Sequence, residues 1–238
     1  MLNWLYPITC QLCGEAAETA LCEECLQSLR RVPRPICLYC GAPVAGEQTD
    51  AYHCPACAAK LRPFELARSA LLTDDKVMPL IHELKYHRGI HLAAAFMPLL
   101  RTLWHETPEL ANHYNKAALV PVPISPQHLR KRGYNQAEEI ALPLAKDLGL
   151  KIIQPLVRLD TGIESQTHLS ASARMKNALE AYAAKQEYAM GRKTLPERLV
   201  IIDDVYTTGA TVRACAAALK KLPGVQKVAV LTLLRVSR

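Results

Sequence analysis

The chain has no apolar run long enough to cross a membrane. Residues 93–100 form a short apolar run between His91 and Arg101, well below the roughly 18 residues that a spanning helix needs. The N-terminus also lacks a basic stretch followed by an apolar core and a cleavage site. These absences argue against a membrane-spanning or secreted protein, and we expect a cytoplasmic one.

Aromatic residues are scarce as well. They make up 5% of the 238 residues, so the sequence offers little for stacking on nucleic-acid bases. There is no low-complexity tract and no tandem repeat apart from the cysteine pairs described next, which excludes a repeat architecture. The formal net charge of +7 suits an anionic ligand or a nucleic acid but does not distinguish between them.

Cysteine, in contrast, is concentrated at one end. Eight of the nine cysteines form four Cys-x-x-Cys pairs within the first 57 residues. Two such pairs supply the four thiolates of a tetrahedral zinc site, so four pairs predict two structural Zn²⁺ ions. Gly14 and Gly41 directly follow their pairs and suit the turn that brings two sulfurs onto one ion. The predicted ligands are Cys10, Cys13, Cys22 and Cys25 for one ion, and Cys37, Cys40, Cys54 and Cys57 for the other.

Other arrangements of these cysteines are compatible with the sequence. The first pair could share an ion with the third, and the second with the fourth. Disulfides would require an oxidising compartment, and the spacing differs from common iron–sulfur runs. Cys215, among alanines, is most simply a small core residue. Because the first 57 residues carry few large apolar side chains, they need metal to fold. We therefore predict a zinc module at 1–60 and a second domain at 61–238.

The second domain alternates strands and helices. We expect strands at 66–73, 116–122, 151–153, 199–202 and 226–235. Helices are expected at 76–88, 91–106, 135–148, 171–184 and 211–222, with a variable segment at 156–170. This alternation predicts an α/β fold with a mostly parallel sheet and helices on both faces. Ligands of such sheets bind at the carboxyl ends of the strands.

Residues 199–211 carry the strongest functional signal. Four apolar residues of a buried strand are followed by Asp203 and Asp204, then by a small hydroxyl-rich turn and a helix start. Backbone N–H groups at the turn and the helix dipole favour a phosphate, and the carboxylates can accept ribose hydroxyls or hold hydrated Mg²⁺. An ordinary strand-turn-helix is the simpler alternative. The predicted phosphate-binding residues are Thr207, Thr208, Gly209, Ala210 and Thr211.

A second strand ends near a basic stretch. After the proline-stiffened residues 121–126 come Arg130, Lys131 and Arg132, then Gly133 and a helix. Such cations could stabilise a pyrophosphate leaving group if both strand ends meet at one edge of the sheet. Alone, the stretch would be read as a solvated basic patch.

All thirteen positions of 199–211 resemble the binding fingerprint for phosphoribosyl pyrophosphate (PRPP) in type I phosphoribosyltransferases. In that family the loop holds the 5′-phosphate and the acidic pair contacts the ribose. The cysteine pairs, the segment 82–86, the stretch 130–136 and the 166–177 segment occur in an order that resembles the ComF family of competence-associated proteins. That family implies a double zinc ribbon before a phosphoribosyltransferase-like domain, and a link to uptake or use of external DNA.

The resemblance also assigns residues. It places Lys85, Arg130, Arg132, Gly133, Asn135 and Gln136 near the pyrophosphate, with Lys85, Arg130, Arg132 and the two aspartates as the catalytic candidates. Gln166, Arg174 and Asn177 would line a flexible segment over the site.

Two function classes follow. One is a phosphoribosyltransferase that uses PRPP and Mg²⁺ with an unidentified acceptor. The other is a protein that binds single-stranded DNA, alongside DNA-uptake or helicase partners, without catalysing a reaction.

Overall fold

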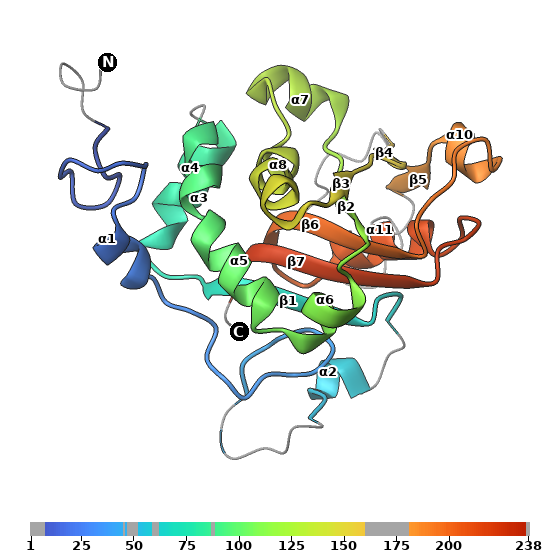
Figure 1. Ribbon diagram of the computed structural model, residues 1–238, viewed down its shortest axis with the longest axis horizontal. Coiled ribbons are helices and arrows are strands. Elements are labelled where there is room, and N and C mark those ends of the chain that lie inside the picture. The colour runs from blue at the N-terminus through green and yellow to red at the C-terminus, as the bar shows by residue number, and fades with distance from the viewer. Residues whose placement is uncertain are drawn as a thin grey trace, which may run out of the picture.

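The computed structural model describes residues 8–44, 46, 52–58, 62–86, 89–159 and 181–236. Its centre is a five-stranded sheet in which every neighbouring pair is parallel (Figure 1). This confirms the predicted α/β fold. In spatial order the strands are β1 (Leu66–Leu72), β7 (Lys227–Arg235), β6 (Arg198–Tyr206), β2 (Ala118–Pro121) and β3 (Lys151–Ile152).

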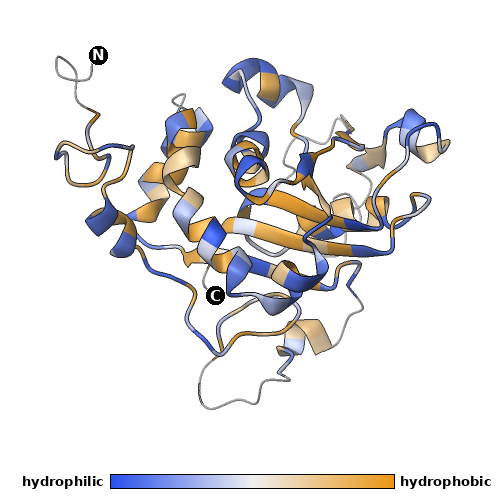
Figure 2. Cartoon of the chain, in the orientation of Figure 1, coloured by the Kyte–Doolittle hydropathy of each residue, from blue (hydrophilic) through white to orange (hydrophobic). Residues whose placement is uncertain are grey.

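Helices cover both faces of this sheet. Because side chains alternate along a strand, Val200 and Ile202 of β6 pack on one face while Leu199 and Ile201 pack on the other. The central strands are accordingly hydrophobic along most of their length in Figure 2. The first face is covered by α3 (Val77–Tyr86), α4 (Ile90–Ala95), α5 (Met97–His105) and α8 (Gln136–Leu148), and the second by α11 (Ala210–Leu219).

Smaller elements surround this core. A two-stranded antiparallel ribbon packs against α11, and α7 stands above α8 in Figure 1. The ribbon consists of β4 (Leu156–Arg158) and β5 (Tyr182–Ala184); the remaining helices are α1 (Glu23–Gln27), α2 (Pro55–Ala58), α6 (Pro108–His113), α7 (Pro126–Arg132) and α10 (Gln186–Ala189).

The cysteine-rich segment is attached to β1. Arg31 forms an isolated antiparallel bridge with Leu71, and the Leu72 N–H donates to the Arg30 carbonyl at 2.8 Å. Further along, the Ala67 N–H donates to the Tyr39 carbonyl at 2.6 Å. The cysteines also pack into the hydrophobic clusters on the two faces of the sheet. Cys10 packs on the face covered by α3, α4, α5 and α8, and Cys37, Cys40 and Cys57 pack on the face covered by α11.

Three expectations are corrected. The helix expected at 91–106 is two helices, because Pro98 lacks the N–H that a continuous helix would need and instead lies in the first turn of α5. Residues 182–184 are a strand paired with β4, not the end of a helix. β6 continues to Tyr206, so Asp203 and Asp204 lie within the strand and not after it.

No helix of the described residues combines the length and the apolar character that crossing a bilayer requires.

Candidate functional site

The eight paired cysteines form two compact groups. The four sulfurs within each group lie within 4.8 Å of one another, and the groups are Cys10, Cys13, Cys22, Cys25 and Cys37, Cys40, Cys54, Cys57. The structure thus selects the sequential grouping over the crossed one. Tetrahedral thiolates at about 2.3 Å from Zn²⁺ would be roughly 3.8 Å apart. The observed separations, 3.9 Å for Cys13–Cys22 and 3.8 Å for Cys40–Cys54, fit that geometry.

Both groups begin with the same turn. The N–H of Gly14 donates to the Cys10 carbonyl and that of Gly41 to the Cys37 carbonyl, each at 2.9 Å, and both glycines have positive φ. A Cβ on Gly41 would lie 2.5 Å from the Ala67 carbonyl oxygen, so a larger residue would push the second group away from β1.

The turns also prepare thiolates for metal. Burial raises the pKa of Cys10, but backbone N–H donors from Cys13, Cys22 and Leu12 outweigh it and lower the pKa to about 6. In the second group, backbone donors likewise outweigh burial and lower the pKa of Cys37 to about 7. Because the thiolate is the metal ligand, these backbone donors favour metal binding by one sulfur in each group.

The acidic pair lies near the carboxyl end of β6. Asp203 and Asp204 are both buried, and Asp203 Oδ1 accepts the backbone N–H of Asp204 at 3.0 Å. Burial raises the pKa of Asp203 well above its usual value, and the neighbouring Asp204 adds to this effect. A buried carboxylate pair is costly in the absence of a cation or a ligand that donates hydrogen bonds.

Asp204 joins a network of residues drawn from three helices. Lys85 Nζ, at the end of α3, lies 2.6 Å from Asp204 Oδ2. Gln136 Nε2, at the start of α8, donates to Asp204 Oδ1 at 3.4 Å and accepts at Oε1 from Arg132 at 2.7 Å. Arg132 also lies over the ring of Tyr86, 4.8 Å from its centroid. The structure therefore brings Lys85, Arg132, Gln136 and Asp204 together.

The other residues of the basic stretch are not in this network. Arg130 and Lys131 are exposed in the last turn of α7, which is mostly hydrophilic in Figure 2. Gly133 ends α7 with a φ of 84°, and the Asn135 side chain caps α8 by accepting from the Ala137 N–H at 3.1 Å. These two residues shape the turn that presents Arg132.

The predicted phosphate loop, residues 207–211, runs from the end of β6 into the first turn of α11. Thr207 and Thr208 are exposed, and Thr208 Oγ1 accepts the Ala210 N–H at 3.3 Å. Gly209 precedes α11 with a φ of 74°. A Cβ there would lie 2.3 Å from the Tyr206 hydroxyl, so glycine is required both by the backbone and by this close approach. The exposed hydroxyls of Thr207 and Thr208 can donate to an anion at the start of α11, where the Ala210 N–H is already bonded within the loop.

Sequence reasoning missed two neighbours of this loop. Tyr182 on β5 is buried, and burial raises the pKa of its hydroxyl while Arg158 and a hydrogen bond with Thr211 act in the opposite direction. Arg158 on β4 lies 5.8 Å from the Tyr182 ring centroid. Tyr182 and Arg158 lie together because β4 pairs with β5, and no local pattern in the sequence predicts that pairing. Gln166, Arg174 and Asn177 lie outside the described residues.

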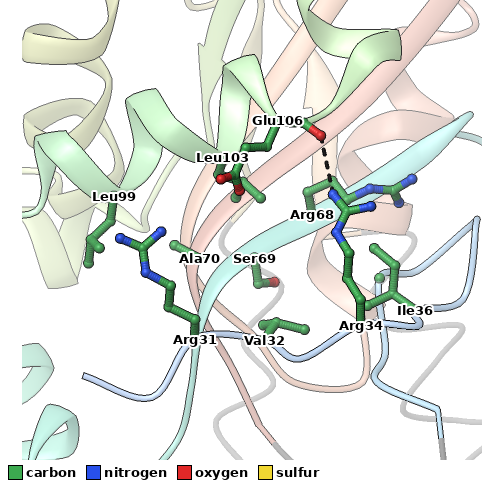
Figure 3. A pocket seen from close by; sticks show the side chains of 11 residues that line it. Arg31, Val32, Arg34, Ile36, Arg68, Ser69, Ala70, Leu99, Leu103 and Glu106 are labelled. Atoms are coloured by element: carbon green, nitrogen blue, oxygen red, sulfur yellow. Dashed lines mark hydrogen bonds between the residues drawn. The ribbon is translucent and has the colours of Figure 1, made fainter. Parts of the chain in front are cut away.

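A separate basic cavity lies between the linker of the two cysteine groups, β1 and α5. It has a volume of about 60 Å³, and three arginines, Arg31, Arg34 and Arg68, line it. In Figure 3 Arg34 and Arg68 converge, and Arg34 donates to the Glu106 carbonyl at 3.2 Å. Arg68 is buried and donates to the carbonyls of Leu38 and Ala67 at 2.9 and 3.0 Å. Arg68 thus has a structural role, whereas Arg31 and Arg34 are exposed.

Comparisons with known proteins agree with this architecture. Residues 1–58 match the double zinc ribbon domain. Over 229 residues the chain is 28% identical to DNA utilization protein YhgH of Salmonella typhimurium, covering 92% of this chain and 90% of that protein.

Two competence proteins are similar at the same level. Competence protein F of Haemophilus influenzae is 26% identical over 223 residues, covering 92% of both chains. Competence protein ComFC of Bacillus subtilis is 26% identical over 219 residues, covering 90% of this chain and 84% of that protein. The resemblance to the ComF family is confirmed by these relatives and by the N-terminal double zinc ribbon.

Proposed function

We propose that this protein binds PRPP together with Mg²⁺ at the carboxyl end of β6, as a phosphoribosyltransferase-like protein linked to the use of external DNA. The observation that carries the proposal is the network of Lys85, Asp204, Gln136 and Arg132, which lies beside Asp203 and directly before the phosphate loop. Cations, carboxylates and oriented N–H groups are the three kinds of partner that a phosphorylated ribose with a pyrophosphate needs.

Each part of the site has a role in this proposal. The phosphate loop receives the 5′-phosphate through its hydroxyls and the N-terminal amides of α11. Asp203 and Asp204 accept hydrogen bonds from the ribose hydroxyls. Lys85 and Arg132, held in place by Asp204 and Gln136, face the pyrophosphate. The PRPP hydroxyls then supply donors to a carboxylate pair that is otherwise expensive to bury.

The donor set also fits Mg²⁺. This ion prefers oxygen ligands and is usually held by one or two carboxylates together with substrate phosphates. Asp203 and Asp204 provide the carboxylates, and the ion would supply neutralisation of charge that develops on pyrophosphate. If a transfer reaction occurs, Lys85 and Arg132 stabilise the same leaving group from the protein side.

Isothermal titration of the intact protein with PRPP and Mg²⁺ tests the proposal. We expect saturable binding of one PRPP per chain that requires Mg²⁺. Asp203→Asn combined with Asp204→Asn should weaken binding by about 1–3 kcal/mol, the scale of lost charged hydrogen bonds. Absence of binding, or an affinity that the double substitution leaves unchanged, would contradict it. Release of pyrophosphate in the presence of candidate acceptors then reports on transfer.

A second candidate function is direct binding of single-stranded DNA. Two exposed basic surfaces favour it: Arg130 and Lys131 on α7, and Arg31 and Arg34 at the cavity shown in Figure 3. Relatives in Salmonella typhimurium and Escherichia coli are named DNA utilization protein. Lysine and arginine contacts to phosphates dominate such binding, so few aromatic residues are needed for it.

The two surfaces predict different behaviour towards PRPP. DNA bound at α7 should be displaced by excess Mg²⁺-PRPP, because Arg130 and Lys131 stand in the same turn as Arg132. DNA bound at the linker arginines should ignore PRPP. DNA-uptake or helicase proteins remain proposed partners, and a reducing cytoplasm is the compartment that suits thiolate zinc sites.

A further inference from the structure

The second cysteine group is connected to the phosphate loop by a short chain of buried contacts. Arg235, near the end of β7, donates from Nη1 to the Cys40 carbonyl at 2.6 Å, and its Nη2 lies 3.5 Å from Cys40 Sγ. The same guanidinium lies over the ring of Tyr206, 4.6 Å from the ring centroid. Arg235 therefore contacts a metal-ligating residue on one side and the last residue of β6 on the other.

Tyr206 continues this connection to the loop. Its side chain is 3% exposed, and its hydroxyl is buried with no hydrogen-bond partner among the residues that the structure describes. The hydroxyl instead packs against the backbone of Gly209, where a Cβ would lie 2.3 Å from it. The position of this ring thus determines how closely the phosphate loop can approach the end of β6.

Charge explains why metal would matter to this chain of contacts. A Zn²⁺ site with four thiolates carries net negative charge, and the Arg235 guanidinium on Cys40 compensates part of it. Without the ion the four sulfurs are no longer held together, so the carbonyl and sulfur of Cys40 lose the fixed position at which they contact Arg235, a buried side chain that is 8% exposed. The first cysteine group has no contact of this kind with an arginine among the described residues.

We propose that Arg235 and Tyr206 are positioning residues that couple metal in the second cysteine group to the conformation of the phosphate loop. Zinc bound to Cys37, Cys40, Cys54 and Cys57 holds Arg235, Arg235 holds the Tyr206 ring, and the ring supports Gly209. The second zinc ribbon is then a part of the ligand site, while the first one is not. The proposal rests on the proposed function only where it concerns PRPP affinity; the effect on the loop itself does not depend on any ligand.

The first test is hydrogen exchange of the backbone amides of residues 207–213, without ligand. Arg235→Lys keeps the charge but loses the fork that reaches Cys40 and the planar contact with Tyr206. We expect faster exchange in the loop, with unchanged exchange in residues 199–202 of β6. Arg101→Lys is the matched control, since Arg101 pairs with Asp147 between α5 and α8, away from the loop. Unchanged loop exchange in Arg235→Lys would overturn the proposal.

A second pair of variants tests the role of the metal. Cys54 and Cys22 are both partly buried ligands, one in each group, and neither contacts Arg235. Each serine variant should lose one zinc per chain, but only Cys54→Ser should speed exchange in the loop. Equal loop exchange in the two variants would show that the coupling is absent. Tyr206→Phe removes the hydroxyl that packs against Gly209, so exchange in the loop should become faster. Because this hydroxyl makes no hydrogen bond among the described residues, thermal stability should not fall.

The third test measures affinity and separates this proposal from the function itself. Arg235→Lys should weaken Mg²⁺-PRPP binding roughly tenfold, the size of about 1.4 kcal/mol of lost loop positioning, and Arg101→Lys should not. If the unaltered protein does not bind PRPP, the proposed function fails while the exchange experiments still decide the coupling. If it binds PRPP and Arg235→Lys binds equally well, the coupling fails and the function stands.

Discussion

The ammonium group of Lys85 is held 2.6 Å from the Asp204 carboxylate, which joins the end of α3 to the carboxyl end of β6. The Asp204 side chain is 6% exposed, more buried than the carboxylate of any other ion pair among the described residues. The contact fixes a cation beside the phosphate loop before any ligand is present.

Lys85→Met should therefore destabilise the protein, because it leaves a buried carboxylate without its cation. Since the Lys85 side chain is itself a quarter exposed, we expect a loss of about 1–3 kcal/mol in the free energy of unfolding, less than for a fully buried pair. Urea denaturation measures it. Lys193→Met is the matched control, because the Lys193–Glu187 pair is exposed and should contribute less than about 1 kcal/mol. Equal losses in the two variants would contradict a special role for Lys85.

Asp203→Asn should stabilise the ligand-free protein and weaken PRPP binding at the same time. Burial raises the pKa of Asp203, so the folded state binds more protons than the unfolded state between the ordinary aspartate pKa of 3.8 and the raised value. Stability from this group is thus present at low pH and is lost as pH rises through that window. Asparagine cannot ionise, so Asp203→Asn avoids the stability that the buried carboxylate loses at neutral pH. Each kcal/mol regained should raise Tm by about 2–4 °C.

The control for that experiment is the same comparison at low pH. Near pH 3, where Asp203 is protonated in both states, the two proteins should melt at similar temperatures. A lower Tm for Asp203→Asn at neutral pH would mean that the ionised carboxylate has a stabilising partner. Binding of Mg²⁺-PRPP requires the ionised carboxylate. As pH is lowered, the affinity of the unaltered protein should therefore begin to fall at a higher pH than it would for an aspartate of ordinary pKa.

Metal analysis of protein purified without chelator should give about two zinc ions per chain, as the two sulfur clusters require. Removal of both ions should be accompanied by loss of structure in the first 58 residues, because this segment has few other core residues. A single ion per chain, or iron in place of zinc, would contradict the assignment of two structural zinc sites.

The salt dependence of DNA binding should locate the basic surface. If Arg130 and Lys131 each contact a phosphate, replacing both with Gln should reduce the slope of log K against log[salt] by about 1.4, at about 0.7 per single-strand contact. Arg31→Gln with Arg34→Gln makes the parallel test of the linker surface. All four side chains are exposed, and thermal melting checks that the fold is kept, since Arg34→Gln also removes the hydrogen bond to the Glu106 carbonyl. A slope that neither pair changes would exclude both surfaces.

Local signals in the sequence predicted most of what lies within one element or one turn. The order of residues 199–211 alone predicts a strand, an acidic pair and a glycine turn. The cysteine pairs likewise predict the tight turns that bring two sulfurs together. Contacts between distant segments were not predictable in this way. Tyr182 was expected in a helix because its pairing with Arg158 spans residues that no local pattern connects. The contacts of Arg235 with Cys40 and Tyr206 likewise depend on the neighbouring ends of β6 and β7.

The attachment of residues 30–39 to β1 has a consequence for solubility. β1 is an outer strand of the sheet. Arg30 and Arg31 of the linker, together with Tyr39 of the second cysteine group, occupy part of its free hydrogen-bonding side. Unpaired strand edges recruit strands from other molecules. When metal is lost and the linker detaches, a hydrophobic outer strand becomes available to a second chain. Zinc depletion should therefore first appear as self-association and precipitation, before the sheet itself unfolds.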